Sequence, residues 1–150
     1  MPLIKLSTDI YADQTKCFDL ARDIDFHQES LKNSNERAID GKTSGLIGLG
    51  EFVTWEATHL GQVQHLSSKI TQFHRPHSFV DEMIAGPFEL MKHEHFFSHK
   101  DGVTNMVDLF YYKSPFGLIG HFMDWIFLKK YLTKLLKKRN SALKIKAESN

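Results

Sequence analysis

The feature that most constrains this fold is one long stretch of helical periodicity near the C-terminal end. From Phe116 to about Lys146 a broad apolar face recurs at helical spacing, through Phe122, Trp125, Leu128, Leu132, Leu135 and Leu136. Ser114-Pro115 precedes this stretch, and proline is favoured at a helix start. A helix of about 30 residues is roughly 45 Å long. Only a large concave surface can bury its apolar face.

The segments before this helix have the properties of β-strands. In the first segment Ile4, Leu6, Thr8 and Ile10 alternate with polar residues, the period of a half-buried strand. Asp101-Gly102 separates the last two segments and strongly favours a hairpin turn. The seven predicted strands cover residues 4–10, 36–40, 51–60, 62–74, 78–85, 89–100 and 103–113.

Two short helices are predicted between the first and second strands. Residues 13–23 have helical spacing, with Asp13 placed to cap the N-terminus, and a second helix covers residues 25–32. Gly41 to Gly50 contains four glycines and predicts a flexible loop. The sequence therefore predicts an α+β chain that forms one domain over residues 1–150.

Bulk composition narrows the class of protein. Hydrophobic residues make up 41% of the 150 residues and charged residues 25%, as in ordinary globular domains, and the net charge of +1 argues against nucleic-acid binding. The single cysteine, Cys17, excludes an internal disulfide and fits a reducing cytoplasm. The N-terminal residues lack the apolar core of a signal peptide. The most apolar stretch, Phe116 to Leu128, is shorter than the roughly 20 residues that a membrane span needs.

A family resemblance adds to this prediction. It is carried by Gly50-Glu51-Phe52-Val53-Thr54-Trp55 with His59-Leu60-Gly61, by Lys69-Ile70-Thr71, by Phe79-Val80-Asp81-Glu82 with Gly86-Pro87-Phe88, by His93-Glu94-His95-x-Phe97, and by Tyr112 with Pro115-Phe116-Gly117. The chain resembles the SRPBCC superfamily, which includes START lipid-transfer domains, the birch-pollen allergen and aromatic polyketide cyclases. Within it, the bacterial polyketide cyclase/dehydrase-like group is the most similar.

The resemblance implies a helix-grip fold. In this fold a curved, seven-stranded antiparallel sheet wraps around a long C-terminal helix, with two short helices after the first strand. The interior between sheet and helix then holds an apolar pocket. Members of the superfamily bind lipids, hormones or polyketides, and a shared fold does not fix the ligand.

Alternation along the strands predicts which side chains face this pocket. The expected face is mainly aromatic and methionine-rich with a few polar groups, which is typical of small-molecule sites. The predicted ligand-binding residues are Trp55, His59, Phe79, Asp81, Met83, Met91, His93, His95, Phe97, Met106, Asp108, Phe110, Tyr112, Phe122 and Trp125.

The polar members of this face have two interpretations. A buried His–Asp pair has pKa values suited to general acid–base work, so His59, Asp81, His95 and Asp108 are candidates for a cyclase or dehydratase. Structural hydrogen bonding between neighbouring strands is the simpler explanation for the same residues. His93 and His95 share one strand face and, with Asp81 or Asp108, have the donor types of a zinc site. Satisfied histidines are the simpler interpretation, so no metal and no cofactor is expected.

Positive charge gathers at the C-terminal end, in Lys129, Lys130, Lys134, Lys137, Lys138, Arg139, Lys144 and Lys146. Cations near a helix C-terminus favour the helix dipole. Alternatively, they attract the chain transiently to anionic membrane surfaces.

The functional prediction is a cytoplasmic protein that binds a hydrophobic small molecule, lipid or polyketide-like, as carrier or sensor. The alternatives are the acid–base enzyme above, or an interaction or regulatory protein without ligand.

Overall fold

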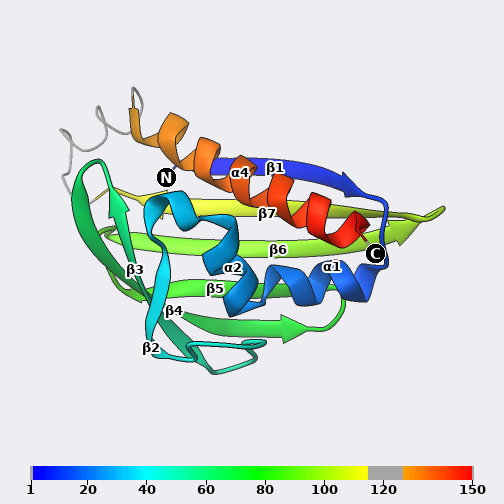
Figure 1. The fold of residues 1–150 in the computed structure, drawn as a ribbon, viewed down its shortest axis with the longest axis horizontal. Coiled ribbons are helices and arrows are strands. Elements are labelled where there is room, and N and C mark those ends of the chain that lie inside the picture. Colours follow the sequence, from blue (N-terminus) through cyan, green and yellow to red (C-terminus); the bar gives the residue numbers. More distant parts are fainter. Residues whose placement is uncertain (1, 115–126, 150) are drawn as a thin grey trace.

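The computed structural model describes residues 2–114 and 127–149 (Figure 1). The elements in chain order are β1 (Leu3–Ile10), α1 (Gln14–Ala21), α2 (Ile24–Ser30), a short 3-10 helix (Lys32–Ser34), β2 (Arg37–Gly41), β3 (Phe52–His59), β4 (Gln62–His74), β5 (Ser78–Ala85), β6 (Leu90–Lys100), β7 (Val103–Lys113) and α4 (Lys129–Glu148).

The seven strands form one antiparallel sheet in the order β1-β7-β6-β5-β4-β3-β2. The helices α1, α2 and α4 all lie over one face of this sheet (Figure 1). Register shifts in β4, at Ser67/Ser68 and at Ile70/Gln72, mark bulges of the kind that bend a strand. The predicted helix-grip fold is therefore confirmed.

Local sequence signals account for the element boundaries. The Asp13 side chain accepts a 3.1 Å hydrogen bond from the Lys16 N–H and caps α1, as predicted. Asp23 caps α2 in the same way through the Phe26 N–H. At the β6–β7 turn, Asp101 and Gly102 both have positive φ, at 53° and 79°, which is the hairpin geometry that Asp-Gly favours.

The helix α4 spans the molecule lengthwise above β1 and β7 (Figure 1). Its buried side chains Leu143 and Ala147 join a core that includes Ile10 of β1 and Phe18 of α1. The first part of the helix predicted from residue 116, with the expected pocket residues Phe122 and Trp125, lies outside the described residues. None of the described helices is long and apolar enough to span a membrane.

Candidate functional site

A cavity of about 740 Å³ lies between the sheet and the helices. Its helical wall comes mainly from α4, through Leu132, Leu135 and Leu136. Its sheet wall includes eight of the residues predicted from strand alternation, namely Trp55, His59, Phe79, Asp81, Met91, His93, His95 and Phe110. The volume falls within the range of about 300 to 1,000 Å³ that small-molecule sites occupy.

Five predicted pocket residues lie outside the cavity wall, although four of them are fully or almost fully buried. Phe97 packs edge-to-face on Phe18 of α1, with ring centroids 5.3 Å apart. Met106 has no exposed surface and belongs to the same core cluster. Tyr112 is buried in a second cluster at the other end of the sheet, and Met83 packs against that cluster. Alternation identifies the inward face of a strand, but it does not show which inward side chains pack into the core clusters and which line the cavity.

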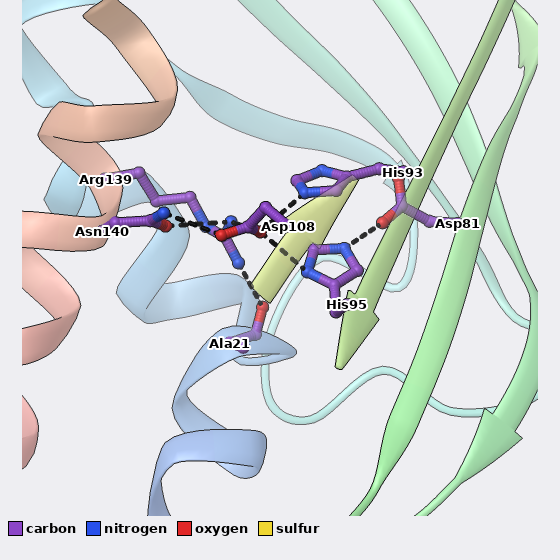
Figure 2. Close-up of polar contacts among 7 residues, drawn as sticks. All are labelled: Ala21, Asp81, His93, His95, Asp108, Arg139 and Asn140. Carbon is purple, nitrogen blue, oxygen red and sulfur yellow. Dashed lines mark hydrogen bonds and ion pairs between the residues drawn. The ribbon is translucent and has the colours of Figure 1, made fainter. Parts of the chain in front are cut away.

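The fifth of these residues is Asp108, one of the predicted catalytic candidates, which lies beneath the cavity rather than in its wall. Its carboxylate has no exposed surface. It accepts hydrogen bonds from His93 Nε2 at 2.8 Å and from Asn140 Nδ2 at 2.7 Å, and Arg139 Nη1 lies 3.4 Å away (Figure 2). Each of these groups offers a donor to a group that only accepts, so the buried charge is satisfied.

A second His–Asp pair adjoins this centre. His95 Nε2 lies 2.7 Å from Asp81 Oδ2, and the His95 ring stacks on His93 with centroids 3.7 Å apart (Figure 2). Burial and the neighbouring His93 lower the pKa of His95 from 6.5 to about 4, so this imidazole is neutral at pH 7. The Nε2–H then donates to Asp81, which leaves Nδ1 as an unprotonated acceptor.

Both carboxyl groups remain ionised. Burial acts to raise the pKa of Asp108, but the hydrogen bond from His93 and the charge of Arg139 outweigh it and hold the pKa well below its usual range. Burial opposes ionisation of Asp81 as well, and the His95 hydrogen bond overcomes it, so that pKa is also lowered. The cavity floor therefore carries two carboxylates, one guanidinium and a neutral imidazole. We call Asp81, His93, His95, Asp108, Arg139 and Asn140 the polar floor.

Sequence reasoning missed two members of the polar floor. Its charge and position place Arg139 with the basic residues of the last helix, but its side chain is 6% exposed and it also donates to the Ala21 carbonyl at 3.4 Å. Asn140 was not singled out at all. The sequence does contain a signal that Arg139 faces inward. Arg139 follows Leu132 and Leu136 at the i+7 and i+3 spacings that keep a residue on the same helix face.

The polar floor contains a possible metal triad. Ligand atoms of Asp81, His93 and His95 lie within 4.8 Å of one another. The two imidazole rings, however, are stacked with an angle of 24° between their planes. Ring nitrogens bind metals through lone pairs in the ring plane, so nearly parallel stacked rings direct these lone pairs into separate planes. In this arrangement the histidines cannot converge on one ion at the roughly 2.0 Å that zinc requires.

A second polar cluster lines the other end of the cavity. His59 Nδ1 lies 2.8 Å from the Tyr131 hydroxyl, a contact that joins the end of β3 to α4. Glu36 Oε1 lies 3.2 Å from His27 Nε2, and Glu36 Oε2 is 3.9 Å from His59 Nε2. His59 was predicted from the β3 face. His27, Glu36 and Tyr131 were not, since nothing in the local pattern shows that a loop before β2 meets α2 and α4.

Solved structures provide the comparison with known proteins. A protein from Thermus thermophilus superposes with a TM-score of 0.74 at 16% identity, covering 99% of this chain and 100% of the other. Ginseng major latex-like protein 151 from Panax ginseng gives 0.72 at 13% identity, covering 99% and 98%. Ara h 8.0201 gives 0.67 at 12% identity, covering 99% of both chains.

At these identities the likeness establishes the fold. The ginseng protein and Ara h 8.0201 are members of the SRPBCC superfamily, and this chain has their helix-grip architecture over almost its whole length. No family model and no curated protein matches the sequence.

Proposed function

We propose that this protein binds a hydrophobic small molecule in the cavity between the sheet and α4, as a carrier or sensor. The observation that carries the proposal is the cavity itself, about 740 Å³ of space with a mainly apolar wall and a polar floor. Sites for small molecules combine these two properties. A lipid or a polyketide-like ring compound has the matching chemistry.

The polar floor would fix the orientation of such a ligand. Asp81 lines the cavity, and its side chain keeps 18% of its surface exposed. Its ionised carboxylate has lone pairs beyond the one that His95 uses, and it can only accept hydrogen bonds. A hydroxyl on an otherwise apolar ligand is therefore the group that fits this end of the cavity.

Acid–base catalysis by a cyclase or dehydratase is a second candidate, favoured by the pairing of His95 with Asp81 at the cavity wall. Two features weigh against it. The acceptor atom His95 Nδ1 is buried and lies 3.5 Å from Asp108 Oδ1, so it is not presented to a substrate. Asp81, with its lowered pKa, is a weak base at neutral pH. The remaining alternative, an interaction protein without ligand, does not account for a cavity of this size.

Titration with a fluorescent apolar probe tests the binding proposal. Ala57 of β3 lines the cavity, so Ala57→Phe places a ring in that space and should weaken probe binding by at least about tenfold, or roughly 1.4 kcal/mol. Val63→Phe is the matched control, since Val63 is 61% exposed and is not part of the cavity wall. Equal binding by the wild type and both variants would place the probe outside the cavity and contradict the proposal.

A further inference from the structure

The outer face of α4 carries a stripe of lysines. Lys130, Lys134, Lys137 and Lys138 are all exposed and recur at helical spacing along one face. We call these four residues the lysine stripe. Among the described residues none of the four takes part in an ion pair. No acidic residue occurs between positions 127 and 147 to offset them.

The helix dipole does not account for this stripe. Its effect is confined to the last turn of a helix. The lysine stripe ends at Lys138, ten residues before the end of α4 at Glu148. The net charge of the whole chain is only +1, so the stripe is a local concentration of charge rather than a consequence of a basic protein. A local positive surface of this kind is suited to an anionic partner.

Exposed apolar side chains lie near the start of the stripe, because the end of β3 contacts α4 at Tyr131, next to Lys130. Phe127, just before α4, and Leu60, in the β3–β4 turn, both line the cavity. They are 46% and 61% exposed. Lysines beside exposed Phe and Leu are the combination found on protein surfaces that lie in the headgroup region of a bilayer. Nucleic acid would be recognised by the lysines alone and gives no role to an apolar rim.

Leu60 is unfavourable for the turn that it occupies. Leu60 and Gly61 have φ values of 55° and 77°, nearly the same as the 53° and 79° of Asp101 and Gly102 in the β6–β7 turn. Asn or Asp is preferred at the first position because a leucine with positive φ is strained. The hairpin itself therefore does not explain why an exposed, strained leucine stands at the cavity rim. An exposed apolar side chain at the cavity rim is suited to a contact outside the folded chain.

We infer that the lysine stripe and the apolar rim of Leu60 and Phe127 dock on an anionic phospholipid bilayer, from which the cavity takes its ligand. The lysines contact lipid phosphates and the two apolar side chains enter the boundary between headgroups and acyl chains. Uptake of the ligand from the bilayer rests on the proposed binding function, whereas the docking itself does not.

Vesicle flotation tests the docking. The wild-type chain should float with vesicles of phosphatidylcholine mixed with phosphatidylglycerol, should release as salt is raised, and should not float with pure phosphatidylcholine. Changing the whole stripe by Lys130→Gln, Lys134→Gln, Lys137→Gln and Lys138→Gln should weaken binding by on the order of a hundredfold or more. The matched control changes Lys5, Lys32, Lys69 and Lys100 to Gln, four exposed lysines on other elements, and should retain binding.

The turn offers a test in which stability and binding move in opposite directions. Leu60→Asn relieves the unfavourable φ, so it should raise the thermal midpoint while weakening vesicle binding. A rise in both quantities would overturn the role of the rim. Loss of vesicle binding by the control as well as the stripe variant, or binding of a DNA duplex but of no vesicle, would overturn the docking. If the wild type takes up the fluorescent probe in buffer but binds no vesicle, docking fails while the cavity function stands.

Discussion

Asn140 Nδ2 on α4 donates a 2.7 Å hydrogen bond to Asp108 Oδ2 on β7, and neither side chain reaches solvent by more than a few per cent. This contact and that of Arg139 with the same carboxylate join the last helix to the sheet that it covers. The polar floor therefore has a structural role in addition to the ligand contact proposed for it.

Removing the charge of Asp108 should destabilise the fold strongly. Asp108→Asn keeps the shape but leaves the buried Arg139 guanidinium without its counter-charge, which typically costs about 3–5 kcal/mol. Urea unfolding measures this change in the free energy of unfolding. Asp9→Asn on the exposed side of β1 is the control and should change stability by less than about 0.5 kcal/mol. A similarly small effect at Asp108 would show that the pair does not hold α4 in place.

His95 should make the fold sensitive to mild acid. Its folded pKa of about 4 lies below the unfolded value of about 6.5, so the unfolded chain takes up a proton first as pH falls. The unfolding free energy should therefore decrease between about pH 6.5 and 4, by up to roughly 1.4 kcal/mol per pH unit from this group. Below that range, protonation of Asp81 and Asp108, whose folded pKa values are lowered, should remove further stability.

Urea unfolding at a series of pH values isolates the His95 contribution. His95→Gln cannot titrate, so its stability should vary less steeply between pH 6.5 and 4 than that of the wild type. His74→Gln makes the same exchange at an exposed position of β4 and is the matched control. Equal slopes for the wild type and His95→Gln would mean that His95 does not titrate as its burial requires.

Cys17 should be unreactive while the chain is folded. The side chain is fully buried, and burial raises the pKa of the thiol above its usual 9.0. The thiolate is the species that reacts with alkylating reagents, so both access and ionisation are suppressed. Labelling with iodoacetamide should be slow in buffer and complete in denaturant. Rapid labelling of the native protein would indicate that α1 opens readily from the core.

The bond between His59 and Tyr131 should slow ligand exchange. It closes part of the cavity wall by joining the end of β3 to α4. Tyr131→Phe removes the hydroxyl with almost no change of volume, so a bound fluorescent probe should dissociate several-fold faster in stopped-flow displacement. Tyr111→Phe is the matched control, since Tyr111 lies on β7 outside the cavity wall. Unchanged dissociation in Tyr131→Phe would show that ligands leave by another route.

The fold was predictable because its signals are local. Period-two alternation, turn residues such as Asp101-Gly102 and the helical periodicity after Ser114 together specify the order of elements. That order, with the family resemblance, specifies the helix-grip architecture. The inward faces of β3, β6 and β7 follow from the same alternation, and Trp55, His93 and Phe110 on these faces are buried and line the cavity.

The polar floor was only half predictable because it depends on contacts between distant segments. Asp108 and Arg139 are 31 residues apart and meet only when α4 covers β7. Read by charge alone, Arg139 belongs to a lysine-rich surface. Phe97 and Met106 show the opposite difficulty: alternation places them inside, but only the packing of α1 and α4 decides that they form core rather than cavity wall.

Native mass spectrometry of the protein purified from its own host tests the central claim most directly. A cavity of about 740 Å³ with an apolar wall should retain a defined small molecule through mild purification. We predict one apolar species at close to one per chain, with a hydroxyl placed to reach Asp81, and its loss in Ala57→Phe. A ligand-free wild-type protein that also fails to take up the fluorescent probe would contradict the proposed binding function.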